Sequence, residues 1–432
     1  MSKSGEKIIQ KLTPGLQNMT ETPKVEAPKE IELDEVRLKR VARPLRHVKH
    51  IPCKAQVFVS KDTPFEFSYD KKIKTPISKN KLVVQVSDVG LNPIDCKIKN
   101  GYTSTLYGQV GVGREYCGVI THVGSDIAFA WHEGDKVMGI YYHPHLGNGS
   151  LQSSILIDPK IDPIVLKPDT ITDEEAGGAL FCLGAAYNIL NKLYKDEYLK
   201  VDSNILINGG TSSLSLFAIQ LLKRVYKVNK RIVIVTSSNG PTVLKEKFPE
   251  LKDDMIFINY LTCRGKSSKP LRTMLKEQKI ADYTDSNATT IEDEPIIPYT
   301  QGKFDIVLDF VGGYDIIAHG SSLIHSKGIY VTTVGDYVAN YKEDIFNSWD
   351  NPSANARKMF NWSFRYVHYY FDPHQKRSSK DDWLETCTKY LQDGTVKCIV
   401  DKTFDWKDTP AAFKYLLTQR AQGKVVLKVE QF

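Results

Sequence analysis

The chain has 432 residues, of which 41% are hydrophobic, 25% charged and 10% aromatic. This length allows two domains with separate cores, and a formal net charge of +7 is too small to indicate a nucleic-acid partner. The sequence has no run of about 18 apolar residues, so no membrane-spanning helix is predicted. The first residues lack the apolar core of a secretory signal. Seven scattered cysteines without a C-x-x-C pair are typical of reduced thiols, so we expect the protein on the cytosolic side of membranes.

Residues 1–50 are predicted to form a flexible basic arm, because the first 30 or so carry no periodic apolar pattern. Residues 37–50, RLKRVARPLRHVKH, contain six Lys or Arg residues and no acid. Leucine and valine recur there at helical spacing, which Pro44 interrupts. Two interpretations stay open for this segment: a basic linker packed loosely on the domain, or a docking segment for anionic lipid or an acidic partner.

From residue 51 the pattern changes to short strands separated by glycine and proline turns, as in KLVVQVSDVGLNP and GDKVMGIYY. Many short strands at close spacing indicate a compact, barrel-like β unit.

Near residue 173 the sequence pattern changes again, to predicted helices that alternate with near-continuous apolar runs. These runs are NILINGG, RIVIVTSS, FDIVLDFVGG and KGIYVTTVG. Such runs are typical of a parallel sheet covered on both faces, so we predict a doubly wound α/β domain. The tail returns to strand, helix and strand.

Two stretches interrupt this pattern, near residues 261–302 and 336–371. Structureless loops of that length are uncommon in compact domains and are often functional. The second stretch is rich in aromatic residues, which form either an exposed contact patch or internal packing. They include Trp349, Phe360, Trp362, Phe364, Tyr366 and Tyr369.

The order of these segments resembles the quinone-oxidoreductase branch of the medium-chain dehydrogenase/reductases. The resemblance depends on GLNPIDCKIKNG, GREYCGVITHVGSD, GDKVMG, GALFCLGAAYNIL, FDIVLDFVGG and the terminal GKVVL, in this order. It implies a GroES-like β-barrel domain formed by residues 51–178 and 372–432. It also implies a Rossmann-type domain over residues 179–371, interrupted by the two insertions.

A closer resemblance is to the fungal ATPase-stabilising factors. It depends on the arm sequence APKEIELDEVRLKRVARPLRHVKHIP, on NGGTSSLSLFAIQLLKR and on SWDNPSANARKMF. The resemblance implies a peripheral protein on the cytoplasmic face of the plasma membrane and secretory pathway. Its implied role is protein transport, namely delivery of the plasma-membrane proton ATPase. Members of the wider family are often dimers through an edge of the Rossmann sheet, so the wider resemblance implies a homodimer.

The wider family transfers hydride from NADPH to quinones or enones, and the resemblance locates its phosphate-binding loop here. This loop comprises Gly209, Gly210, Thr211, Ser212, Ser213, Leu214 and Ser215. The family pattern has glycine at 209, 212 and 215, but a serine Cβ crowds close backbone approach to a pyrophosphate. Serine hydroxyls can nevertheless donate to phosphate, and the helix dipole is unchanged. We therefore expect either no cofactor or NADPH.

Four other positions match or depart from the family's site. Asn92 and Asp95 match its active-site Asn-Pro-x-Asp motif, although such residues also form ordinary turns. Tyr187 is retained as a cofactor-binding candidate or as packed core, whereas Ala185 replaces a threonine that helps to orient the nicotinamide.

The segment after the second buried strand contains Ser237 and Ser238 and no acid to bind a ribose 2′-hydroxyl. This absence favours NADP over NAD, with Lys245 or Lys247 available for a 2′-phosphate.

A zinc site is not expected. The zinc-dependent branch has Cys, Gly-His-Glu and a four-cysteine lobe, where this chain has Asn92, Gly113-Arg114-Glu115 and no lobe. His143 and His145 form an isolated H-x-H without a matched partner, so we interpret them as surface polar residues.

Three hypotheses follow: a membrane adaptor with a degenerate cofactor site, an active NADPH-dependent quinone or enone reductase, and an NADPH sensor without turnover.

Overall fold

The computed structural model describes residues 49–101, 108–143, 146–281, 296–338, 356, 363–374 and 382–430. The predicted arm therefore lies outside the described residues, apart from Lys49 and His50 at the start of the first strand. Residues 48–432 belong to one compact unit.

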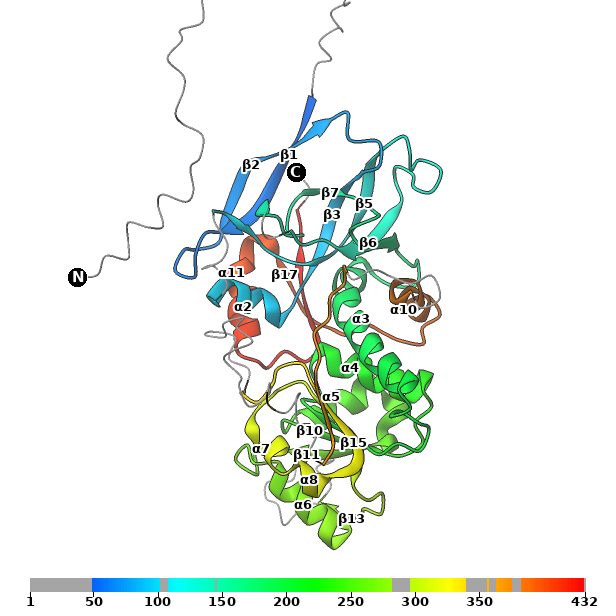
Figure 1. The fold of residues 1–432 in the computed structure, drawn as a ribbon. Coiled ribbons are helices and arrows are strands. Elements are labelled where there is room, and N and C mark those ends of the chain that lie inside the picture. The colour runs from blue at the N-terminus through cyan, green and yellow to red at the C-terminus, as the bar shows by residue number, and fades with distance from the viewer. Residues whose placement is uncertain are drawn as a thin grey trace, which may run out of the picture. The chain divides into compact units, whose positions relative to one another are not determined.

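A six-stranded, all-parallel sheet forms the Rossmann-type part, in the order β11-β10-β9-β14-β15-β16. Figure 1 labels β10, β11 and β15 of this sheet. Its strands are β9 (Ile205–Asn208), β10 (Ile232–Thr236), β11 (Met255–Asn259), β14 (Phe304–Asp309), β15 (Ile324–Thr332) and β16 (Arg365–His368). Every residue of β9, β10 and β11 is buried, as expected for a sheet covered on both faces. The predicted doubly wound domain is confirmed.

The two faces of this sheet pack against different helices, because successive strand residues point to opposite faces. Ile205 and Ile207 join a core with α3 and α4, whereas Leu206 joins a second core with α6, α7 and α8. The helices in and around this part are α3 (Asp173–Lys195), α4 (Ser213–Gln220), α5 (Gly240–Lys247), α6 (Ser268–Glu277), α7 (Tyr314–Ala318) and α8 (Gly320–Leu323). None of the described helices is long and apolar enough to cross a lipid bilayer.

A seven-stranded sheet forms the GroES-like part, in the order β17-β18-β3-β5-β6-β8, with β7 also paired to β3. Its strands are β3 (Leu82–Leu91), β5 (Glu115–Val123), β6 (Lys136–Ile140), β7 (Ser154–Ile157), β8 (Ile164–Leu166), β17 (Val400–Asp405) and β18 (Lys424–Lys428). Strand β18 pairs with β3, with Val425 opposite Leu91. The tail therefore completes a sheet begun more than 300 residues earlier in the chain.

A smaller sheet in the order β2-β1-β4 accompanies this part. It consists of β1 (Lys49–Phe58), β2 (Glu66–Thr75) and β4 (Val110–Gly111). Helix α2 (Pro93–Gly101) follows β3 directly, and the tail contributes α10 (Trp383–Gln392) and α11 (Thr409–Leu417). The GroES-like barrel predicted from the sequence is confirmed together with the Rossmann-type domain.

The stretch 261–302 is more ordered than its polar composition indicated. It contains α6 and two short antiparallel strands, β12 (Lys279–Ala281) and β13 (Ile296–Pro298). Leu271 and Met274 of α6 are buried on one face of the helix, and this spacing of three is the periodic signal that the polar composition obscured.

The aromatic-rich stretch also contributes to the Rossmann-type core, since β16 lies within it. Tyr366 is buried and stacks on Tyr330 with ring centroids 5.9 Å apart. Phe364 packs where a Cβ on Gly320 would stand, and burial raises the pKa of Tyr369 to about 12. Internal packing, and not an exposed patch, accounts for these three aromatics. Trp349, Phe360 and Trp362 lie outside the described residues.

Candidate functional site

Asn92 lies at the junction between β3 and α2, where the family's active-site motif was expected. Its backbone N–H donates to Asp95 Oδ2 at 2.7 Å, which is the local turn bond predicted as the alternative role. The side chains of both residues are buried, at 1% and 5% exposed. The structure therefore brings the two predicted residues together, and Asn92 also makes long-range contacts.

A buried polar cluster surrounds Asn92 and joins four distant parts of the chain. The Lys424 ammonium donates to Asn92 Oδ1 and to Glu115 Oε1, both at 2.7 Å, and lies 3.5 Å from Cys182 Sγ. Asn92 Nδ2 donates to Glu115 Oε1 at 2.8 Å, and the Phe181 backbone N–H donates to Glu115 Oε2 at 2.9 Å. Lys424 is 1% exposed and Glu115 0%.

The donors of the Lys424 ammonium are already engaged by the protein. An ammonium has three N–H groups, and three acceptors of the cluster surround Lys424. Preorganised donors stabilise negative charge on a reacting carbonyl only when they are directed at it. In this geometry Lys424 has no remaining donor for a substrate.

Burial and neighbouring groups shift the pKa values of several cluster members in opposite directions. Burial alone would lower the pKa of Lys424, but Cys182 and the Glu115 carboxylate outweigh burial and raise it above its usual range. Burial raises the pKa of the Cys182 thiol, although Lys424 opposes that shift. Burial also raises the pKa of Asp95 to about 6, against the attraction of Arg114. Lys424 Nζ and Glu115 Oε1, 2.7 Å apart, form a buried ion pair.

Glycines allow α3 to approach this cluster closely. A Cβ on Gly178 would stand 2.4 Å from Lys424 Cγ, and a Cβ on Gly90 would stand 2.7 Å from Gly178 Cα. Gly178 thus leaves room for the Lys424 stem between β18 and α3.

Sequence reasoning missed Glu115, Cys182 and Lys424 as members of the site. Each lies within a family motif, in GREYCG, GALFCLGAAY and GKVVL respectively. The signal available was that a Glu and a Lys occur inside otherwise apolar segments, where charges are rarely buried unless paired.

The loop between β9 and α4 retains the tight glycine turn of a phosphate-binding loop. Gly209 has φ +96°, and a Cβ on Gly210 would stand 2.2 Å from Ile234 Cγ2, so both positions require glycine. Ser212 is the N-cap of α4, where its Oγ accepts from the Ser215 backbone N–H at 3.2 Å.

The hydroxyls of Ser212 and Ser215 form hydrogen bonds within the loop. Ser215 is 0% exposed and its hydroxyl donates to the Gly209 carbonyl. The Ser212 and Ser215 oxygens are 2.8 Å apart, and each hydroxyl has only one hydrogen to donate. Because Ser215 uses its hydrogen on Gly209, Ser212 donates to Ser215. Both hydroxyl donors are therefore used within the loop, while Thr211 and Ser213 are partly exposed beside it.

The segment after β10 lies next to this loop, because the N–H groups of Gly209 and Gly210 both donate to the Val235 carbonyl. Ser237 is partly buried and Ser238 is exposed. Lys247 is exposed at the last turn of α5, which begins at Gly240.

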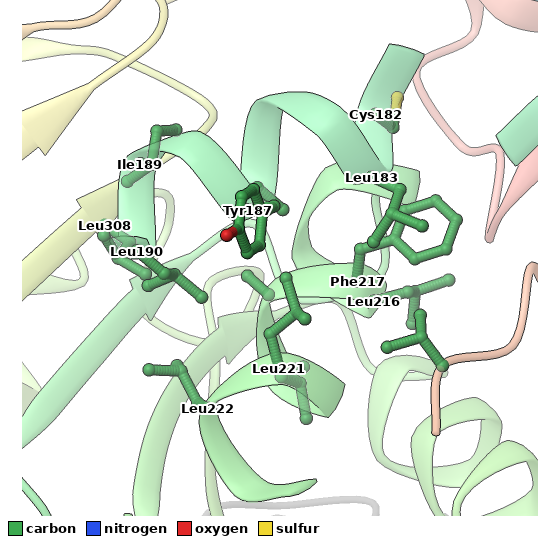
Figure 2. Packing of buried hydrophobic residues seen from close by; sticks show 14 of the residues in the cluster. Cys182, Leu183, Tyr187, Ile189, Leu190, Leu216, Phe217, Leu221, Leu222 and Leu308 are labelled. Atoms are coloured by element: carbon green, nitrogen blue, oxygen red, sulfur yellow. The ribbon is translucent and has the colours of Figure 1, made fainter. Parts of the chain in front are cut away.

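Tyr187 lies in the core between α3 and its neighbours. Figure 2 shows it among Leu190, Leu221 and other buried apolar side chains, and it is 7% exposed. Ala185 is buried in the same helix, also at 7% exposed. The packed-core interpretation of Tyr187 therefore has direct support in the geometry.

A second buried polar network stands at the carboxyl ends of β9 and β14. Asp309 Oδ1 accepts from Asn208 Nδ2 at 2.8 Å, and Asp309 Oδ2 accepts from the Tyr330 hydroxyl at 2.6 Å. Asp309 Oδ1 also accepts from the backbone N–H groups of Val311 and Gly312. This carboxylate fixes the second glycine turn, whose Val311 packs where a Cβ on Gly209 would stand.

Within the described part of the chain, no group of three or more His, Cys, Asp or Glu residues is arranged to hold a metal ion. His143 Nε2 lies 2.7 Å from Asp162 Oδ1, and His145 lies outside the described residues. His143 is therefore occupied by a carboxylate partner.

Comparison with known proteins agrees with this architecture. The model of the alcohol dehydrogenase GroES-like domain matches residues 78–159, and that of the zinc-binding dehydrogenase matches residues 275–427. The quinone oxidoreductase from Coxiella burnetii has a TM-score of 0.57 at 20% identity, over 88% of this chain and 99% of its own, which shows the fold.

Two full-length relatives come from Saccharomyces cerevisiae. Protein AST1 is 64% identical over 430 residues, 98% of this chain and 99% of its own length. Protein AST2 is 61% identical over 432 residues, 99% of this chain and 100% of its own length. The predicted family is confirmed: the chain belongs to the AST family, within the medium-chain dehydrogenase/reductase superfamily.

Proposed function

We propose that the protein is a peripheral membrane adaptor of quinone-reductase fold that promotes targeting or stabilisation of the plasma-membrane proton ATPase. It acts at the cytoplasmic face of the plasma membrane and secretory pathway. The partner is suggested by the resemblance to the ATPase-stabilising factors, and attachment to an anionic membrane by the basic arm. A homodimer formed through β16, the edge strand of the parallel sheet, is part of the same proposal.

The observation that carries this proposal is the hydrogen bonding of the Ser212 and Ser215 hydroxyls within the 209–215 loop. The family's fold suggests NAD(P) binding, in which backbone N–H groups at the α4 N-terminus would receive the pyrophosphate. Here the Ser212 side chain caps that N-terminus and takes the Ser215 N–H. We infer that these residues are a poor fit for a dinucleotide and that the cofactor site is degenerate.

The first test is an NADPH titration followed by fluorescence. We expect no saturable change below about 1 mM NADPH, the upper end of ordinary substrate affinities. The S212G/S215G variant should gain binding, because it restores both family glycines. Ser213→Gly is the matched control, since it adds loop flexibility at a position where the family needs no glycine. Tight binding by the unaltered protein would contradict the degenerate site.

The second test measures the proton ATPase at the surface of cells that lack this protein and its relatives. Restoring the unaltered chain should raise the surface level, and S212A/S215A should restore it equally well. Unchanged ATPase levels would refute the adaptor role.

The alternative function is an active NADPH-dependent quinone or enone oxidoreductase. It is favoured by the retained Gly209-Gly210 turn, with φ +96° at Gly209, and by the absence of an acid at Ser237 and Ser238. Steady NADPH oxidation with quinone substrates, abolished by Gly210→Val, would establish this function in place of the adaptor. Saturable binding without turnover would support the sensor hypothesis.

A further inference from the structure

The β1–β2 hairpin gathers positive charge from two separate stretches of the chain. In its antiparallel register Lys49 is opposite Thr75, His50 is opposite Lys74, and Pro52 is opposite Lys72. Figure 1 shows the two strands side by side. The pairing therefore joins the end of the basic segment 37–50 to residues 71–81, KKIKTPISKNK, which contain five lysines and no acid.

Three lysines on strands β1 and β2 are exposed and form no ion pair among the described residues. Lys49, Lys72 and Lys74 are exposed, and none of them forms an ion pair with another residue in the part of the chain that the structure describes. Acidic Asp70 lies within the register shift, between Lys71 opposite Cys53 and Ser68 opposite Ala55, and its carboxylate accepts from the Ser68 hydroxyl. Many other lysines have carboxylate partners, for example Lys136 with Asp173. An uncompensated charge of this kind attracts an anionic surface.

Lys71 has a different role from its neighbours. Its ammonium donates to the Gly147 carbonyl and, at 2.7 Å, to Asn148 Oδ1. Burial lowers the pKa of Lys71 to about 8. This lysine holds the loop around residue 147 and is excluded from the charged surface.

A small buried apolar cluster lies beneath the exposed lysines and holds the two strands in place. Cys53, Ile73 and Val83 form a small buried cluster, with Ile51 and Ile77 packed against it. The exposed side therefore presents long, flexible cationic side chains on a fixed strand pair.

We propose that the Lys49–Thr75 end of the hairpin is a docking surface for anionic phospholipid headgroups. Lysine is a point charge without the planar fork that selects fixed carboxylate pairs, and diffuse attraction of this kind suits a fluid layer of headgroups. This inference rests on the proposed membrane function and assigns its attachment site.

The test is flotation of the full-length protein with phosphatidylcholine vesicles that contain about a third phosphatidylserine, at about 0.1 M salt. The K49E/K72E/K74E variant should lose at least about tenfold in vesicle partitioning, since each basic residue near the surface contributes measurably. K252E/K266E/K269E is the matched control, because these exposed lysines lie elsewhere and their reversal changes the net charge equally. The control should float like the unaltered protein, and neither variant should change the thermal unfolding midpoint.

Several results would overturn the assignment. Equal flotation of the hairpin variant and the unaltered protein would show that the lysines only protect an edge strand from pairing. Equal losses in both triple variants would show a net-charge effect without a site. Hairpin-dependent capture by polyglutamate, without vesicle binding, would replace the lipid surface with an acidic protein.

The experiment also separates this inference from the proposed function. If flotation depends on Arg37, Arg40 and Arg43 but not on the hairpin, the hairpin assignment is wrong while membrane attachment stands. If the hairpin binds vesicles but the surface ATPase level is unaffected by the protein, the adaptor role is wrong while the docking surface stands.

Discussion

The buried cluster around Lys424 and the loop around Ser212 fill the two places where the family's chemistry and its cofactor are expected. The first is built from charged groups and the second from neutral hydroxyls. In the first, the protein engages the Lys424 ammonium, and in the second it engages the Ser212 and Ser215 hydroxyls. They differ in energetic cost, because a buried charge without its partner is far more costly than an unpaired hydroxyl. The cluster should therefore resist substitution, whereas the loop should tolerate it.

Removing Lys424 is the strongest way to test this difference. Lys424→Met leaves the fully buried Glu115 carboxylate without its cation, and breaking such a pair costs about 3 to 5 kcal/mol. Urea unfolding at neutral pH measures the loss. Lys428→Met is the control, because the Lys428–Glu174 pair is exposed and its loss should cost less than about 1 kcal/mol. Similar losses for both variants would show that the cluster is not energetically special.

The pH dependence of stability tests a second buried charge at the edge of the cluster, the carboxyl group of Asp95. Its pKa is about 6 in the folded protein and about 3.9 in an unfolded chain. Between pH 4 and 6 the folded state retains a proton that the unfolded state has released, so stability falls as the pH rises. Relative to Asp95→Asn, the unaltered protein should lose about 2 to 3 kcal/mol across that window. A pH-independent difference would show that Asp95 ionises normally.

The smallest effect is expected in the loop. Ser212→Ala removes the N-cap of α4 and should lower the free energy of unfolding by about 1 kcal/mol. Ser213→Ala in the first turn should have almost no effect. A loss in Ser212→Ala as large as that in Lys424→Met would remove the contrast between the two regions.

The sequence predicted most of the fold because apolar runs and glycine turns repeat in the order of a known family. It underestimated residues 261–302 and 336–371, where polar residues and aromatics obscure the spacing that buries α6 and β16. For the site, the sequence identified Asn92 and the 209–215 loop from local motifs. It missed Lys424 because that residue meets Glu115 only after the tail strand pairs with β3.

The hydrogen-bond partners of the Ser212 and Ser215 hydroxyls also could not be predicted from the sequence. A serine in such a loop can donate to a ligand or back to the chain. The choice depends on where the Gly209 carbonyl lies, and a motif does not specify that position.

The pairing of β18 with β3 also has a consequence during synthesis of the chain, because β18 is made long after β3. Lys424 follows Glu115 by 309 residues in the chain. At a synthesis rate of about 5 to 20 residues per second, the ribosome makes Lys424 roughly 15 to 60 s after Glu115. During that interval the unfinished sheet exposes an edge and a carboxylate without its cation. A polypeptide released before its last ten residues would lack both strand β18 and Lys424. We expect cellular quality control to recognise such a chain as incomplete.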